Sequence, residues 1–292
     1  MTTDSSALAA VPEAPRPLQE WSSDSRYSLL WKLSELWRFR ELLWALSIRS
    51  IKARYKQSVL GISWAIIQPF AMMVVFTVVF SKFAKVDTGN IPYPVFSYAA
   101  LLPWQLFQNC VTKGTGSVVE NGGIVKKIYF PREVCPLSAV LSSLVDFGVA
   151  AVMLVILMVF YRTPLSVAVL WLPLMLVIEI IFSLGIAFVL SAVNVFYRDI
   201  GFGLGLVMQV WMYACPVAYP ISKALEHLSK PFQQLYMLNP MTPIIDNFRR
   251  VLVEQQQPDW SYLLPATVLS VLLMVIGYWY FKRAEGTFAD VL

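Results

Sequence analysis

Acidic and histidine side chains are the first candidates for chemistry in this sequence, and they are few. Most of the basic residues lie in segments that connect long apolar stretches. In these segments, the acids that could act together are Glu120, Glu133 and Asp199. Each of them lies close to a basic residue, and the one histidine, His227, is far away in the sequence. Metal-assisted displacement needs several such side chains that converge on one point. The sequence therefore gives little support to a metal-dependent enzyme.

Two further acids, Asp146 and Glu179, lie within long apolar stretches. A charged side chain at the centre of a bilayer costs about 2.5–3.5 kcal/mol, so such residues usually face a cavity or a polar partner. A proton relay is one interpretation. However, the apolar stretches contain no basic residue that could pair with either acid. We therefore expect two neutral or hydrogen-bonded carboxyl groups that face the interior of a helix bundle.

A glycine-rich stretch follows the second apolar stretch, at Lys113, Gly114, Thr115, Gly116 and Ser117. A nucleotide-binding loop has the spacing G-x-x-x-x-G-K-[ST] and connects a strand to a helix. This stretch has neither feature. We therefore expect that ATP and Mg²⁺ are bound by another protein, and that this chain has no cofactor of its own.

The chain as a whole is dominated by six long apolar stretches. Hydrophobic residues make up 58% of the 292 residues, and charged residues only 14%. A helix of about 20 apolar residues crosses a hydrocarbon core of roughly 30 Å, and a helix satisfies its own backbone hydrogen bonds in lipid. We predict an all-α integral membrane protein with six transmembrane helices, near residues 61–79, 93–111, 137–160, 167–195, 202–218 and 263–281.

Two segments precede the membrane domain, which we place at residues 58–292. Residues 1–27 are polar and rich in Ala, Ser and Pro, which predicts a disordered cytoplasmic tail. Residues 28–57 predict an amphipathic helix that lies in the headgroup plane, with docking on protein as the alternative. One face would carry Leu33, Trp37, Trp44, Ile48, Ile51 and Tyr55, and the opposite strip Arg38, Arg49, Lys52 and Lys56.

Basic residues concentrate in alternate connecting segments. Lys and Arg are frequent before residue 58, between residues 112 and 134, and directly after residue 281. The positive-inside rule then predicts that both termini lie in the cytoplasm. On the outer side, residues 219–261 are too polar to span the membrane and predict short helices that dip into the outer leaflet. Their prolines are Pro220, Pro231, Pro240, Pro243 and Pro258.

Several short motifs occur in an order that is similar to one family of membrane proteins. They are residues 53–61 (ARYKQSVLG) with Trp64, Gln68 and Pro69, residues 127–133 (KIYFPRE), residues 194–200 (NVFYRDI), and residues 238–246 (LNPMTPIID) with Phe248 and Arg249. From about Leu36 to the C-terminus, the chain resembles the permeases of ABC transporters that export polysaccharides, the class that handles O-antigen, capsule and teichoic acid. The resemblance implies six transmembrane helices, an N-terminal interfacial helix, and short re-entrant helices between the fifth and sixth spans.

The resemblance also implies partners and a location. Two copies of the chain would form a channel in the bacterial cytoplasmic membrane, and two copies of a separate ATPase subunit would drive it. The cargo would be a polysaccharide on an undecaprenyl-diphosphate carrier; nucleic acid would not be a partner. In the family, the loop between the second and third spans docks on the ATPase. This implies contacts at Glu120, Asn121, Gly122, Gly123, Lys126, Lys127, Tyr129, Arg132 and Glu133.

Three more sets of residues are expected to contact the cargo or close its path. Since arginine and lysine pair with phosphate, the carrier headgroup would be received by Arg40, Arg49, Lys52, Arg54 and Lys56. Weak stacking on sugars suits a channel lined by Tyr98, Trp104, Phe107, Trp211 and Tyr213. For most aromatic residues, an interfacial belt is the alternative. The outer gate would include Pro220, Asn239, Pro240 and Pro243.

Two other functions are consistent with the same composition. An exporter of small drugs or lipids could use a similar six-helix plan and would not need a continuous aromatic path. A membrane-embedded enzyme that acts on polyprenyl-linked sugars would turn over its substrate without an ATPase. We favour the polysaccharide permease, because its motifs occur in the same order along most of the chain.

Overall fold

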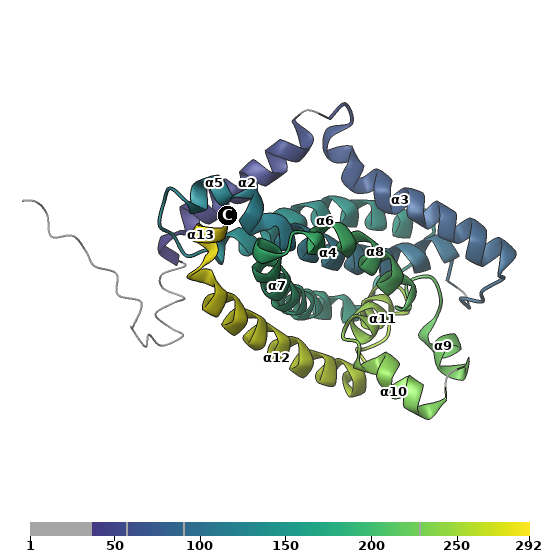
Figure 1. The fold of residues 1–292 in the computed structure, drawn as a ribbon. Coiled ribbons are helices and arrows are strands. Elements are labelled where there is room, and N and C mark those ends of the chain that lie inside the picture. The colour runs from purple at the N-terminus through teal and green to yellow at the C-terminus, as the bar shows by residue number, and fades with distance from the viewer. Residues whose placement is uncertain (1–36, 57, 90, 228) are drawn as a thin grey trace, which may run out of the picture.

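The computed structural model describes residues 37–56, 58–89, 91–227 and 229–292. The predicted tail at residues 1–27 and the first part of the predicted amphipathic helix lie outside these ranges. All regular secondary structure in the described part of the chain is helical, as predicted. Figure 1 shows the helices gathered into one bundle, with the C-terminus near the short helix α5 (Gly122–Val125).

Four helical segments are long and apolar enough to cross a membrane. They are Gly61–Phe83, which contains α3 (Trp64–Phe76), then α6 (Val134–Phe160), then Val167–Phe196, which contains α7 (Leu172–Phe196), and finally α12 (Trp260–Glu285). Short 3₁₀ turns precede α3 and α7 at Gly61–Ser63 and Val167–Trp171, and a π-helical segment, Thr77–Phe83, follows α3. These segments coincide with the first, third, fourth and sixth predicted spans.

The helices at the second and fifth predicted spans differ from the prediction in length. α4 (Tyr93–Glu120) is one helix of 28 residues, which continues more than two turns beyond the predicted end at Val111. α8 (Asp199–Tyr213) has 15 residues. At about 1.5 Å per residue this helix is about 22 Å long, which is shorter than a hydrocarbon core of roughly 30 Å.

α4 lies at the centre of the bundle and contacts α6, α7 and α8. Its side chains are buried along most of its length. α12 packs along α7, where Gly185 and Gly277 bring the two backbones together. A Cβ atom at Gly185 would lie 2.7 Å from the backbone nitrogen of Met274. The long helices are therefore arranged around α4, and the α7–α12 contact depends on two residues without side chains.

Three short helices connect α8 to α12, namely α9 (Ile221–His227), α10 (Lys230–Leu238) and α11 (Met241–Leu252). α11 packs against α4, α7 and α12 through a buried apolar face that includes Ile244, Ile245 and Phe248. In Figure 1 the helices α9 and α10 lie at the end of the bundle opposite to α13 (Phe288–Val291). These helices close the bundle on the side that we predicted to face outward.

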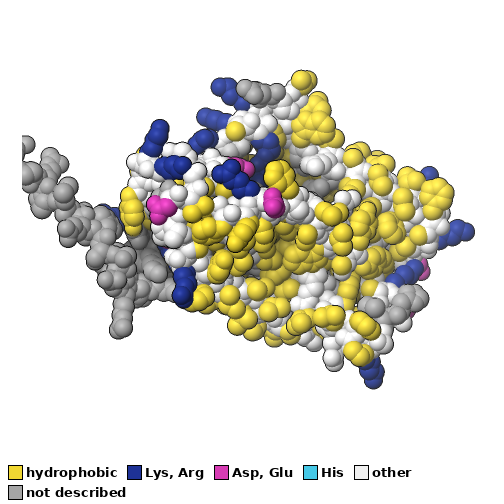
Figure 2. Space-filling view, in the orientation of Figure 1, with side chains coloured by type: hydrophobic (Ala, Val, Ile, Leu, Met, Phe, Trp, Pro, Cys, Tyr) yellow, Lys and Arg dark blue, Asp and Glu magenta, His cyan; other side chains and the backbone are white. Residues whose placement is uncertain are grey.

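The surface of the bundle is strongly apolar. Figure 2 shows hydrophobic side chains across the middle of one face, with most of the visible Lys and Arg at the end where α2 (Arg40–Tyr55) and α5 lie. On α6, for example, Val152, Val155 and Ile156 are each more than half exposed. A soluble monomer rarely exposes an apolar surface of this extent. The distribution suits helices that contact lipid.

Candidate functional site

The most unusual group of side chains surrounds Asp146, in the middle of α6. The residue as a whole is 7% exposed. Arg54 Nη1 and Lys113 Nζ both donate to Asp146 Oδ2, the lysine at 2.6 Å, and Tyr55 Oη donates to Oδ1 at 2.6 Å. The expectation that no basic residue could pair with Asp146 is therefore wrong. The two cations come from neighbouring helices that reach the carboxylate from the basic end of the bundle.

Two helices bring the hydrogen-bond donors to Asp146: α2 carries Arg54 and Tyr55, and α4 carries Lys113. α2 packs on α6 through Leu46 and Ser47, which are buried, and this brings its last turn with Arg54 and Tyr55 to Asp146. Lys113 reaches the carboxylate because α4 continues as a helix past Val111. The indole groups of Trp37 and Trp44 are 70% and 62% exposed, so they face away from the packed side of α2.

Lys113 was not predicted as a site residue because it lies beyond the second apolar stretch, in the segment that was predicted to connect two spans. A pattern in the sequence does point to it. Gln105, Asn109 and Lys113 are spaced by four residues, which places them on one face of a helix. In the structure this polar face lines a hollow of about 300 Å³ between α2, α3, α4 and α6, together with Gln68 and Asp146.

A second hollow, of about 320 Å³, lies beside the first between α2, α4 and α6. The two hollows share Arg54 and Lys113. The cluster contains two cations and one carboxylate, so it has one excess positive charge. Burial and the Asp146 carboxylate raise the pKa of Tyr55, which keeps its hydroxyl a hydrogen-bond donor at neutral pH. The arrangement can therefore hold a negatively charged group.

The other predicted headgroup residues lie on α2 or, for Lys56, directly after it, and they are exposed. They are Arg40, Arg49, Lys52 and Lys56. Arg49 contacts the side-chain oxygen of Asn121 at 3.5 Å, which is long for a hydrogen bond. Of the five predicted cations, the structure therefore brings only Arg54 to Asp146. Whether the other four meet a headgroup stays a prediction.

The predicted coupling residues divide into three groups. Gly123, Lys126, Lys127 and Tyr129 are exposed, and we call them the coupling tip. Arg132 and Glu133 face inward, toward the C-terminal end of α12. The remaining three, Glu120, Asn121 and Gly122, lie where α4 ends and α5 begins. α4 ends at Glu120, and α5 begins with Gly122 and Gly123.

The two inward-facing residues, Arg132 and Glu133, contact Lys282 and Glu285 at the end of α12. We call these four residues the ionic brace. Lys282 Nζ donates to Glu133 at 2.6 Å and to Glu285 at 2.7 Å. The backbone amide of Arg132 donates to Glu285 Oε1 at 3.0 Å, and its guanidinium donates to the Glu285 carbonyl. Burial and the Glu285 charge raise the pKa of Glu133, while Lys282 opposes this. The ionic brace therefore joins residues 120–133, which we call the coupling segment, to α12.

The predicted channel residues do not share one surface. Tyr98, Trp104 and Phe107 are at most 1% exposed, in the core of the single chain. Phe107 packs on Phe182, with ring centroids 5.2 Å apart, and on Trp211, at 5.1 Å. A transported molecule could reach these three residues only if helices moved apart, so their role as channel lining stays a prediction. Tyr213 is 52% exposed and is the most accessible of the five.

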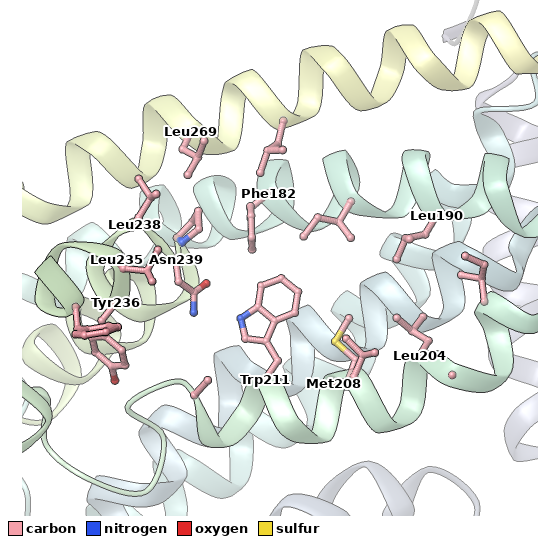
Figure 3. A pocket seen from close by; sticks show the side chains of 18 residues that line it. Phe182, Leu190, Leu204, Met208, Trp211, Leu235, Tyr236, Leu238, Asn239 and Leu269 are labelled. Carbon is pink, nitrogen blue, oxygen red and sulfur yellow. The ribbon is translucent and has the colours of Figure 1, made fainter. Parts of the chain in front are cut away.

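Trp211 also lines a large apolar hollow of about 1040 Å³ between α7, α8, α10 and α12. In Figure 3 the indole of Trp211 points from α8 toward Phe182 of α7, and Leu269 approaches from α12. Asn239 and Tyr236 bring polar groups to one end. The remaining lining is almost wholly hydrocarbon.

The predicted outer-gate residues lie around a non-helical turn at residues 214–220. Asn239 Nδ2 donates to Cys215 Sγ at 3.2 Å, while Pro240 and Pro243 are buried at the start of α11 and Pro220 precedes α9. Arg249 was predicted only as part of a motif and not as a gate residue; it is 1% exposed and donates to the carbonyl oxygens of Pro216, Val217 and Tyr219. Its guanidinium lies 3.8 Å from the ring centroid of Phe96. Arg249 thus fixes this turn to α11 and α4.

Comparison with known proteins gives a consistent result. The family model described as ABC-2 type transporter matches residues 41–253. The O-antigen export system permease protein RfbA of Myxococcus xanthus is 30% identical over 257 residues, which cover 88% of this chain and 97% of the relative. A protein of the same name from Klebsiella pneumoniae is 27% identical over 253 residues (86% and 95%), and the polysialic acid transport protein KpsM of Escherichia coli is 21% identical over 244 residues (82% and 92%). With most of its length matched in this way, the chain belongs to the ABC-2 type transporter family.

Proposed function

We propose that this chain is the channel-forming subunit of an ABC exporter that moves a lipid-linked polysaccharide, such as O-antigen, across the cytoplasmic membrane. The relatives with the highest identity reported above are named as O-antigen export permeases, and the chain covers almost their whole length. The observation in the structure that carries the proposal is the excess positive charge at Arg54 and Lys113, beside two polar hollows. An undecaprenyl-diphosphate carrier would present its headgroup there.

The topology in this proposal has six membrane helices, with both termini in the cytoplasm. α4 and α8 supply the two spans that are less apolar or shorter than the other four. The short helices α9, α10 and α11 would re-enter the outer leaflet and act as the gate. The gathering of Lys and Arg at the α2 and α5 end supports a cytoplasmic position for that end.

The energy for export would come from a partner. Two copies of the chain would associate with two ATPase subunits that bind ATP and Mg²⁺, and the coupling tip would dock on the ATPase. Its residues are exposed and two of them are lysines, which suits contact with another protein. ATP binding would then move the coupling segment, and with it the helices that the segment contacts.

An exporter of small apolar molecules is the second candidate, because the hollow beside Trp211 is apolar and of the size that holds drug-like ligands, roughly 300–1,000 Å³. In that case cells without the chain would lose efflux of apolar dyes and keep their surface polysaccharide. This outcome separates the two candidates.

Deletion of the gene in its host tests the proposal. Surface polysaccharide should disappear, and lipid-linked polysaccharide should accumulate on the cytoplasmic side of the membrane. The unaltered chain should restore export, whereas a chain with Lys126→Glu and Lys127→Glu at the coupling tip should be made and inserted but restore it poorly. Normal surface polysaccharide in the deletion strain would contradict the proposed function.

A further inference from the structure

We infer that the hollow between α2, α4 and α6 is a binding site for a phosphate or diphosphate ester, and that Asp146 pairs with the cations of this site when no ligand is bound. The inference relies on the proposed function only for the natural ligand, a lipid-linked diphosphate. The hollow of about 320 Å³ is lined by three cations, Arg49, Arg54 and Lys113, and one acid, Glu120, together with polar side chains that include Asn121, Ser138 and Ser142. It therefore combines cations with groups that can form neutral hydrogen bonds.

The cations are the accessible part of the Asp146 cluster. The exposed fraction of the side chain is 33% for Arg54, 21% for Lys113 and 9% for Asp146. Arg54 and Lys113 both line the hollow, whereas Asp146 lines only the neighbouring one. An anion that enters the hollow thus meets the guanidinium and ammonium groups without first passing the Asp146 carboxylate. The Glu120 carboxylate also lines the hollow, but three cations outnumber it.

The hydroxyl groups on α6 add a second type of contact. Ser138 and Ser142 now donate to the carbonyl oxygens of Cys135 and Ala139 in their own helix, at 2.7 and 2.8 Å. A hydroxyl group can rotate and donate to a ligand instead. The oxygens of a phosphate accept several hydrogen bonds at once, and those from charged donors are short and strong. This combination of donors fits a phosphate group.

Asp146 makes the site respond to ligand charge. Arg54 and Lys113 share one oxygen of the carboxylate. A diphosphate has more negative charge and more acceptor oxygens than a carboxylate, so it can compete for both cations. Once Arg54 pairs with the ligand, the last turn of α2 keeps only Tyr55 as a hydrogen bond to Asp146. Ligand binding would then favour a conformation in which α2 moves relative to α6.

The test uses the purified full-length chain without ATPase, in nanodiscs of uncharged lipid, with inorganic diphosphate as the probe in calorimetric titrations. Diphosphate should bind, and Lys113→Gln should weaken binding about tenfold, as expected for one charged hydrogen bond. Asp146→Asn should strengthen binding by a similar factor, because the competing carboxylate is gone. Control variants at exposed residues elsewhere, Arg198→Gln and Asp199→Asn, should leave the affinity unchanged.

Ser142 and Ser143 provide a matched pair that leaves the ion pairs intact. Both hydroxyl groups donate to the Ala139 carbonyl, but only Ser142 lines the hollow. Ser142→Ala should weaken diphosphate binding several-fold, and Ser143→Ala should not. Equal effects of the two substitutions, or an affinity that Lys113→Gln leaves unchanged in a folded protein, would overturn the inference.

Two further titrations identify the source of the phosphate group. Undecaprenyl diphosphate and phosphatidylglycerol are each added to the nanodiscs, and displacement of inorganic diphosphate is measured. Displacement by the first alone assigns the site to a carrier lipid, and equal displacement assigns it to membrane phospholipid. Neither ATP nor export enters this assay. If diphosphate did not bind, the site would be refuted and the proposed function would stand. Normal surface polysaccharide in the deletion strain would refute the proposed function and leave the site standing.

Discussion

Two carboxyl groups in apolar helices of this protein have opposite surroundings. Asp146 accepts hydrogen bonds from Arg54, Lys113 and Tyr55, which offset the loss of water around its charge. Glu179, on α7, is fully buried, and neither of its carboxyl oxygens has a hydrogen-bond partner among the described residues. A buried polar group without a partner costs about 1–3 kcal/mol. Asp146 therefore connects three helices, whereas Glu179 destabilises this conformation.

Replacing Glu179 with methionine should stabilise the protein. The substitution Glu179→Met removes an unpaired polar group and keeps a flexible apolar side chain of similar length, so the gain should be about 1–3 kcal/mol. Asp146→Asn should do the opposite, because it leaves two cations without a counter-charge. Thermal unfolding of the purified proteins in detergent measures both. A lower melting temperature for Glu179→Met would mean that this carboxyl group has a partner in the assembled transporter, and would revive the proton relay.

Asp246, on α11, makes stability depend on pH. Burial raises the pKa of its carboxyl group from 3.8 to about 6, against the opposing effect of Arg249. The folded protein thus binds this proton more tightly than the unfolded chain does. The favourable contribution is complete below about pH 4 and is lost as the pH rises through about 6.

The substitution Asp246→Asn should remove this dependence. The variant should match the unaltered protein near pH 4 and exceed its stability at pH 8, by on the order of 3 kcal/mol at most. Melting temperatures of the two proteins across this range give the comparison. If the difference between them stayed constant with pH, Asp246 would not titrate as described.

Among the helices, the closest approach occurs at glycines that no local pattern identifies. Gly201 and Gly205 have the G-x-x-x-G spacing typical of close helix packing, yet a Cβ atom at Gly205 would meet no atom within 4 Å. The contact lies instead between Gly185 and Gly277. These residues belong to helices separated by about 90 positions in the sequence, and pairing between distant helices is set by the whole bundle. The spacing within one helix therefore could not predict it.

Alanine at Gly277 should separate α7 from α12. The new Cβ atom would overlap the backbone of Gly185, which cannot rotate away as a side chain could. Overpacking of this kind costs about 1–3 kcal/mol. Gly277→Ala should therefore lower the melting temperature, while the control Gly205→Ala should leave it unchanged or raise it slightly, because alanine favours helix. Equal melting temperatures for the two variants would place the α7–α12 contact elsewhere.

The lengths of the helices show where sequence reasoning succeeds. Four spans are apolar along their whole length and have charged residues near their ends, and they lie where predicted. α4 was predicted to end too early because the apolar stretch ends at Val111 and Lys113 follows it. In the structure the helix continues, and Gly114 packs against Ala187 of α7, where a Cβ atom would lie 2.7 Å from the alanine Cβ. Hydropathy marks the end of an apolar stretch but not the end of the helix, so Lys113 was placed in the connecting segment.

At the scale of the whole molecule, the coupling segment is connected to helices on both of its sides. The ionic brace joins it to α12 through Lys282 and Glu285. On the other side, Arg49 of α2 approaches Asn121 at 3.5 Å, and α2 is held to α6 by the Asp146 cluster. A movement of the coupling tip would therefore reach α12 through strong, buried contacts and α2 through weaker ones. α12 is the helix that should follow the ATPase most closely.

Breaking the brace should separate ATP hydrolysis from export. Lys282→Gln removes the shared cation, so the coupling segment should lose its hold on α12 although the tip can still dock. In the assembled transporter, we expect ATPase activity within about twofold of normal and export reduced at least about tenfold, since a coupling of 1–3 kcal/mol corresponds to factors of about 5–150. The neighbouring cation Arg283, which lies over the Trp279 ring, provides the control Arg283→Gln.

A second variant is needed as a control, because Lys282→Gln leaves the buried carboxylate of Glu133, which is 2% exposed, without its cation and could disturb folding. Glu285→Gln keeps the ion pair between Lys282 and Glu133. It removes the ion pair between Lys282 and Glu285 and should weaken the bond from the Arg132 backbone amide, while the guanidinium of Arg132 keeps its bond to the Glu285 carbonyl. Its export defect should be smaller than that of Lys282→Gln, with ATPase activity again preserved. If both variants lost ATPase activity and export in parallel, the brace would serve only to hold the ATPase docking surface in shape, and force would have to reach the channel through helices other than α12.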